Sequence, residues 1–165
     1  FEVFKDSLDC NPSLIVNLQG DMPNIQPQAI KDLIIYMEKS QCDIGTLASE
    51  INSNSELENK DVVKVMVKDR LKSGMFCEAI DFLRTKPNTQ NEIYHHIGIY
   101  AFTNKALMRY VSLSRSKLEI DRKLEQLRAM ENGMSIHVGY INSSPLSVDT
   151  EKDFIEVKKL MEKND

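Results

Sequence analysis

Two aspartates occupy places in the sequence where carboxylates commonly do chemistry. Asp21 directly follows the apolar run 13–18, in the sequence QGD, and Asp149 directly precedes a helical pattern, in the sequence VDT. In open α/β sheets, ligands bind outside the carboxyl ends of the strands, and Mg²⁺ is commonly held by one or two carboxylates together with substrate phosphates. The two acids are therefore a candidate magnesium site, provided that the fold brings them together. The alternative is local, with a turn aspartate at 21 and helix capping at 149.

A second group of candidates consists of polar side chains inside apolar patterns. His96 lies in an aromatic and β-branched run at 93–102, and Glu125 with Gln126 lies in a helical pattern at 116–132. Taken alone, these residues are more simply explained as a satisfied structural histidine and two solvated helix residues. The sequence contains no Walker loop and no GxGxxG, GxSxG or HExxH motif, so it does not indicate the enzyme classes that those motifs mark.

The candidate residues must be positioned by strands that alternate with helices. Pro27 opens a predicted helix, and the apolar face of this helix carries Leu33 and Met37 at helical spacing. A helix with Phe1 and Leu8 on one face is expected at the start of the chain. Apolar or β-branched runs predict strands at 13–18, 43–49, 61–67, 93–102 and 135–140, whereas the segment 75–83 is ambiguous. Further helices are predicted at 103–110, at 116–132 and after Thr150.

Capping residues support the boundaries of the later helices. Ser116 with Glu119 forms a capping-box pattern, Gly133 is suited to a helix C-terminus, and Thr150 with Asp153 caps the last helix. The alternation of strands and helices predicts one α/β domain over residues 1–165 with a mostly parallel sheet. Because the chain opens within an apparent helix, we expect this domain to be truncated at its N-terminus.

Composition excludes several kinds of partner. The net charge is −4 and the basic residues are spread along the chain, which argues against nucleic acid. No apolar run approaches the roughly 18 residues of a membrane helix, and no signal-peptide pattern opens the chain, so a cytoplasmic protein without membrane contact is expected. The three cysteines have neither metal-site nor disulfide-framework spacing.

Several segments together resemble the 3-deoxy-manno-octulosonate (Kdo) cytidylyltransferase family. They occur in the order of the family and cover nearly the whole chain; they are IVNLQGDMP (15–23), TLAS (46–49), VVKV (62–65), HHIGIYAF (95–102), KLEQLRAMENGMSIHV (123–138) and VDTEKDF (148–154). The combination of HIGIY, LEQLR, IHV and VDT is fairly specific.

This resemblance implies a fold, a reaction and an assembly. The fold is that of the nucleotide-diphospho-sugar transferases, a Rossmann-like α/β domain with a small projecting β region that forms a homodimer. The reaction is CTP plus Kdo giving CMP-Kdo and pyrophosphate with Mg²⁺, in a cell that makes lipopolysaccharide or a related glycan.

The resemblance also assigns roles to residues of this chain. Asp21 and Asp149 would hold Mg²⁺, and Gln19 would contact the sugar acid or the nucleotide. The Kdo pocket would be lined by four further residues, namely His96, Tyr100, Glu125 and Gln126.

The chain also departs from the family pattern. The basic loop that cradles the triphosphate is absent from the sequence, Met22 replaces a glutamate, and Ser147 replaces a glycine. Residues 114–117 replace a proline-rich stretch. Glu78 stands where the family has an arginine, and a glutamate there would repel the sugar-acid carboxylate. Two alternatives therefore stay open: a non-catalytic truncated or split-gene remnant, and a cytidylyltransferase for another sugar acid such as sialic acid.

Overall fold

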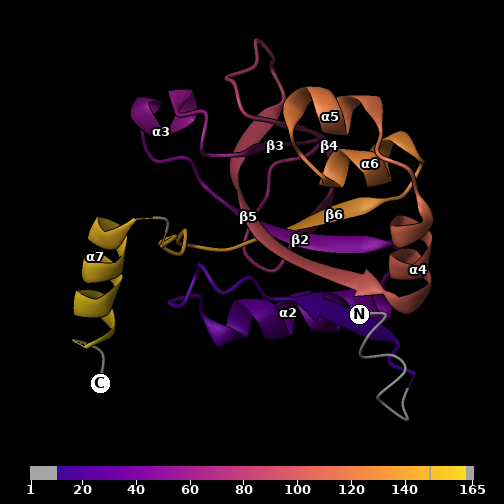
Figure 1. The fold of residues 1–165 in the computed structure, drawn as a ribbon, viewed down its shortest axis with the longest axis horizontal. Helices are drawn as coiled ribbons and strands as arrows, with labels where there is room; N and C mark the ends of the chain where they lie inside the picture. The colour runs from indigo at the N-terminus through magenta and orange to yellow at the C-terminus, as the bar shows by residue number, and fades with distance from the viewer. Residues whose placement is uncertain (1–10, 149, 163–165) are drawn as a thin grey trace.

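The computed structural model describes residues 11–148 and 150–162, and within them it contains a six-stranded sheet with helices on both faces (Figure 1). The strands are β1 (Leu14–Asn17), β2 (Ile44–Ser49), β3 (Lys64–Val67), β4 (Phe76–Leu83), β5 (Glu92–Thr103) and β6 (Ile136–Tyr140). The helices are α2 (Pro27–Lys39), α3 (Asn54–Glu58), α4 (Asn104–Ser112), α5 (Lys117–Arg122), α6 (Gln126–Glu131) and α7 (Glu151–Met161).

The sheet is mixed, and the expectation of a mostly parallel sheet is wrong for the described strands. Only β2 and β6 pair in parallel, and every other neighbouring pair is antiparallel. One reason lies in the connections: no helix separates β3, β4 and β5 along the chain, and without a crossover helix β3 pairs antiparallel with both β4 and β5. The strand order is β1-β5-β2-β6-β4-β3, and a further β5–β3 pairing closes five of the strands into a ring.

The core has one cluster on each face of the sheet. On one face, α2 packs Leu33 and Met37 against β2, where a methyl group at Gly45 would lie 2.7 Å from the sulfur of Met37. This glycine therefore permits the close approach of the helix. The other face is covered by α4, α5 and α6. Leu127 of α6 and Leu124, in the turn between α5 and α6, join the larger cluster there.

The predicted helix at 116–132 is broken into α5 and α6. The capping box of Ser116 with Glu119 is present, but the chain leaves the helix at Lys123, which adopts a left-handed conformation with φ 55°. The apolar positions hold the reason: after Leu118 the next core residue is Leu124, a spacing that does not return to the same helix face.

Other predictions at this level are confirmed within the described residues. Pro27 opens α2, Gly133 has φ 67° after α6, and Thr150 with Asp153 forms the capping box of α7. The short helix α3 was not predicted, and the helix expected around Phe1 lies outside the described residues.

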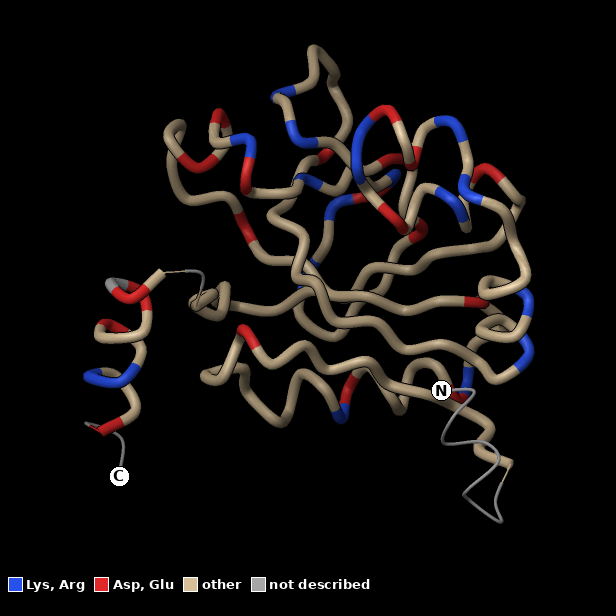
Figure 2. Tube along the Cα trace, in the orientation of Figure 1, with Lys and Arg blue, Asp and Glu red and all other residues tan. Residues whose placement is uncertain are grey.

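Charge and surface character agree with the composition. Figure 2 shows acidic and basic residues distributed over the helices and connecting loops, while the strands at the centre are almost free of them. Cys42 and Cys77 are buried free thiols. Within the described ranges, no helix combines the length and apolar character needed to span a bilayer.

Candidate active site

A cavity of about 1080 Å³ lies between β1, β5, α4 and the turn that joins α5 to α6. The residues that the resemblance assigned to substrate contacts all line it, although they come from three separate parts of the chain: Gln19, His96, Tyr100, Glu125 and Gln126. Asp21 is not among the lining residues, and Asp149 lies outside the described residues. The cavity is therefore the place where the predicted sugar-acid residues meet.

Strand β5 supplies one wall of this cavity through its alternation. His96, Gly98 and Tyr100 face the cavity, whereas Ile97 and Ile99 between them are buried in the core on the α2 side. Side chains of a strand point alternately to its two faces, so the HIGIY segment places its cavity-lining residues on one face and its core residues on the other. His95 accordingly points elsewhere, and its Nδ1 lies 2.7 Å from Oε1 of Glu56 in α3.

His96 is held as a neutral ring by burial. The histidine is 6% exposed, and burial, with a smaller contribution from the charge of His95, lowers its pKa to about 3. Its Nε2 lies 2.9 Å from Oγ1 of Thr46. The Thr46 hydroxyl has one proton, and the carbonyl oxygen of Ile99 lies 2.7 Å away to accept it.

The direction of the Thr46 bond determines the tautomer of His96. Because Thr46 donates to the backbone carbonyl, it must accept from His96, and Nε2 therefore carries the proton. Nδ1 is left as the acceptor of a ring that lines the cavity. His96 thus offers a hydrogen-bond acceptor to a hydroxyl group, and it offers no positive charge to an anion.

Tyr100 contributes a donor from the same strand. Its pKa is raised, first by burial and then by the neighbouring Tyr110 and Glu125, so the phenol stays protonated at physiological pH. Gln19 lies beside Gly98 of the same strand, where a methyl group would come within 3.2 Å of the Gln19 side-chain oxygen. Glycine at this place in β5 leaves room for the amide of Gln19 over the strand.

Glu125 and Gln126 are positioned by the turn between α5 and α6. The left-handed Lys123 ends α5, and in the residues that follow Glu125 is exposed and Gln126 is 8% exposed. The hydroxyl of Tyr110 donates to the backbone oxygen of Glu125 at 3.1 Å, which ties the turn to α4. Both residues therefore lie at a helix start that is fixed from two sides.

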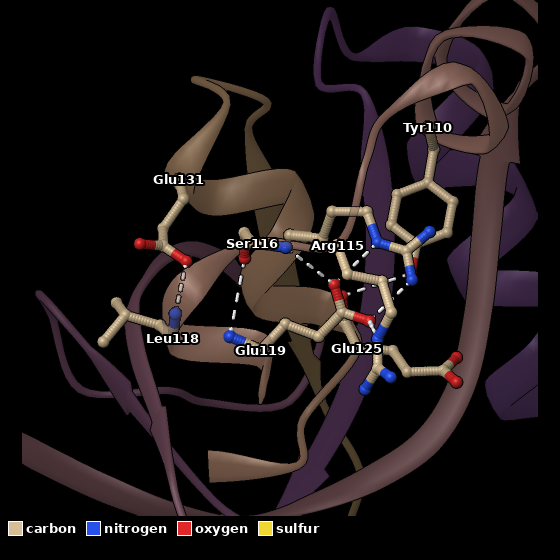
Figure 3. A network of polar contacts seen from close by, with 8 residues as sticks. Tyr110, Arg115, Ser116, Leu118, Glu119, Glu125 and Glu131 are labelled. Atoms are coloured by element: carbon tan, nitrogen blue, oxygen red, sulfur yellow. Dashed lines mark hydrogen bonds and ion pairs between the residues drawn. The ribbon is translucent and has the colours of Figure 1, made fainter. Parts of the chain in front are cut away.

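A buried ion-pair network supports this turn (Figure 3). The carboxylate of Glu119 is 1% exposed and accepts hydrogen bonds from Arg115, from Arg128 and from the backbone N–H of Ser116. These bonds, above all those from Arg128, outweigh burial and lower the pKa of Glu119 to about 2. The Arg128 guanidinium also lies over the ring of Tyr110, 4.8 Å from its centre.

Asp21 lies where the loop after β1 meets the segment before α7. Its backbone oxygen accepts a hydrogen bond of 2.8 Å from the N–H of Val148, and Asn24 accepts one from the N–H of Leu146. Oδ1 of Asp21 is buried without a hydrogen-bond partner among the described residues, which is costly unless a cation or donor completes it. Within the same residues, no group of three or more histidine, cysteine or acidic side chains forms a metal cluster.

Three residues of the site were not singled out from the sequence. Thr46 occurs in the TLAS segment, but nothing in the residue pattern links it to His96. Arg84 and Lys123 also line the cavity. Glu78 was expected to disturb substrate binding, yet it is exposed and is absent from the cavity lining, because alternation in β4 places it opposite the buried Cys77 and Ala79.

Comparison with known proteins identifies the family. A family model described as Cytidylyltransferase matches residues 1–136. The chain belongs to the cytidylyltransferase family. Among curated cytidylyltransferases, the chain is 41% identical over 151 residues to the 3-deoxy-manno-octulosonate cytidylyltransferase of Bartonella tribocorum, covering 89% of this chain and 60% of the relative. It is 44% identical over 140 residues to the enzyme of that name from Brucella ovis, covering 84% and 55%.

Solved structures agree with the cytidylyltransferase assignment. A CMP:2-keto-3-deoxy-manno-octonic acid synthetase complexed with CTP has a TM-score of 0.85 and 29% identity, covering 99% of this chain and 66% of that one. A 4-diphosphocytidyl-2C-methyl-D-erythritol synthase from Anaerococcus prevotii has a TM-score of 0.59 at 15% identity, covering 97% and 64%, and shows the shared α/β fold alone. The chain spans about 60% of the length of the curated relatives named above.

Proposed function

We propose that this cytidylyltransferase chain carries the sugar-acid side of an enzyme that transfers CMP from CTP to Kdo. The observation that supports this most is the cavity, which gathers Gln19, His96, Tyr100, Glu125 and Gln126 from three distant segments. The two curated relatives described above are both named 3-deoxy-manno-octulosonate cytidylyltransferase. The product would be CMP-Kdo, a precursor for lipopolysaccharide made in the cytoplasm.

The residues of the cavity suit a polyhydroxylated acid. Neutral His96 presents an acceptor, the protonated Tyr100 presents a donor, and the amides of Gln19 and Gln126 present both. Such a set binds and orients hydroxyl groups. In the reaction, the anomeric hydroxyl oxygen of the sugar acid bonds to the α-phosphorus of CTP, the bond to the bridging oxygen breaks, and pyrophosphate leaves while the hydroxyl proton is released. Catalysis of this kind consists mostly of positioning and charge neutralisation.

Asp21 is the residue whose environment fits Mg²⁺. Its buried, unpartnered Oδ1 is a hard oxygen ligand, and its contact with Val148 brings the loop after β1 to the segment that leads to Asp149. We propose that both aspartates hold the ion, which would neutralise phosphate charge. A homodimer, suggested by the family resemblance, is a further proposal that light scattering checks.

The test is pyrophosphate release from CTP, Kdo and Mg²⁺ by the chain. Asp21→Asn and Asp149→Asn should each reduce the rate about 100-fold or more, since such transition-state contacts are worth several kcal/mol. Asp121→Asn, a change at an exposed acid on α5, serves as the matched control. Release with sialic acid in place of Kdo would show that the sugar acid has been misassigned, and folded protein without release would support the non-catalytic alternative.

A further inference from the structure

Arg84 supplies a positive charge to the cavity that the family resemblance does not account for. It directly follows β4, is partly buried and lines the cavity. Nη1 donates to the backbone oxygen of Lys60 at 3.2 Å and Nη2 to that of Lys123 at 3.5 Å. No carboxylate of the described residues forms an ion pair with it. Its orientation is therefore fixed by neutral groups and its charge is left available.

A buried lysine holds the backbone of Arg84 in place. Lys64 in β3 is fully buried, and its ammonium donates to the backbone oxygen of Arg84 at 3.1 Å and to that of Asn59. Burial lowers the pKa of Lys64 most, with Glu56 opposing this effect and Arg84 adding to it. Lys64 donates hydrogen bonds to the two backbone oxygens, and these bonds fix the position at which Arg84 leaves the sheet.

The charges that line the cavity leave a net positive end. Arg84 and Lys123 are its cations, and Glu125 is its acid among the described residues. The nearby Asp81 is paired with Arg122 at 2.7 Å, and Glu56 is bound to His95. Since His96 is neutral, an anionic group of a ligand has Arg84 and Lys123 as its available counter-charges in the described part of the site.

We propose that Arg84 binds the carboxylate of the sugar-acid substrate. This inference rests on the function proposed above and assigns its charged contact. A planar guanidinium with free N–H donors matches a carboxylate better than a lysine ammonium does. Glu78, which stands where the resemblance places an arginine, does not line the cavity, so Arg84 reaches it from the end of the same strand instead.

The experiment measures equilibrium binding of Kdo by calorimetry with Mg²⁺ and CDP present, together with binding of the Kdo carboxamide and of CTP. Arg84→Gln should weaken Kdo binding about 10- to 100-fold, as expected for the loss of a charged hydrogen bond. The affinity for CTP should change by no more than about twofold. The affinity for the Kdo carboxamide should differ little between the unaltered chain and Arg84→Gln, because the carboxamide carries no charge. Lys86→Gln, at an exposed lysine in the same loop, is the control and should bind like the unaltered chain.

Each other outcome is decisive. Arg84→Gln with unchanged Kdo affinity, an equal loss for the carboxamide, or a loss confined to CTP would overturn the proposal while leaving the function standing. An unaltered chain that binds CTP but not Kdo would refute the proposed function itself. If Arg84→Gln fails to fold by circular dichroism, Arg84→Lys replaces it, and an intermediate affinity that still discriminates against the carboxamide supports the assignment.

Discussion

Thr46 acts on the site through a single hydrogen bond. It is fully buried and does not line the cavity, yet its hydroxyl decides which nitrogen of His96 carries a proton. A valine has the same shape without the hydroxyl. Replacing the threonine therefore isolates the hydrogen bond from the packing.

We expect Thr46→Val to destabilise the fold by about 1–3 kcal/mol, because a buried ring N–H loses its acceptor. Kdo binding should weaken about 10-fold, since the ring is then free to change tautomer or to tilt. Urea unfolding and calorimetry measure the two effects. Thr46→Ser keeps the hydroxyl, so a serine variant as defective in binding as the valine variant would contradict this role.

Residue-level roles differ in how far the sequence can reveal them. The segments around Gln19, His96 and Glu125 were recognisable as motifs, and the structure brings them to one cavity. Thr46 and Arg84 were missed because their importance depends on a partner about 50 residues away and on a neutral hydrogen-bond environment. Neither property leaves a local pattern in the chain.

At the level of elements, the α5–α6 turn depends on the buried carboxylate of Glu119. Its folded pKa of about 2 lies below its ordinary value of 4.5. The ionised carboxylate therefore contributes its full stabilisation above about pH 4.5 and loses it as the pH falls toward 2.

Glu119→Gln should accordingly cost about 3 kcal/mol of unfolding free energy at pH 7, because Arg128 loses its main counter-charge. The difference between the two proteins should shrink steadily from pH 4.5 to pH 2. Chemical denaturation at several pH values measures it. Glu38→Gln, at an exposed glutamate on α2, is a matched control, and a constant difference across this range would contradict the assigned ion pair.

The left-handed Lys123 gives a second prediction for this turn. A non-glycine residue at φ 55° is strained, so Lys123→Gly should raise stability by about 0.5–1 kcal/mol after the entropy of the unfolded glycine is subtracted. The melting temperature should rise by about 2–3 °C. Lys123→Val should lower it, and a stabilising valine would show that the turn is formed differently.

The two element-level corrections have signals that are visible in retrospect. A continuous helix from 116 to 132 would need apolar core residues at positions 121 and 122. Because these positions hold Asp121 and Arg122, the helix breaks directly after them. Three strands between residues 64 and 103 have no helix between them, which points to antiparallel pairing rather than the parallel arrangement expected from the alternation of strands and helices. Pro27, by contrast, was sufficient to place the start of α2, and local capping residues were sufficient to place the starts of α5 and α7.

For the whole molecule, stability is distributed unevenly between the sheet and α7. Figure 1 places α7 to one side of the sheet, and Val157 is its one buried residue among the described side chains. Phe154, Ile155, Leu160 and Met161 are largely exposed. Strand β2, in contrast, is buried throughout its length.

We expect the amide hydrogens of α7 to exchange in a local opening that leaves β2 and β5 protected, because few buried contacts hold the helix. Hydrogen-exchange mass spectrometry of the chain at neutral pH measures this directly. Equal protection of α7 and β2 would show that the helix unfolds only together with the sheet.

The pairing of β2 has a consequence for synthesis of the chain. Its two neighbours, β5 and β6, both lie far downstream, so β2 leaves the ribosome with neither edge covered. It must wait for residues 92–103 and then for residues 136–140 before its backbone is fully paired. During that interval a buried strand of the finished protein is an exposed, apolar template, and chaperone binding to the nascent chain should be strongest before β6 emerges.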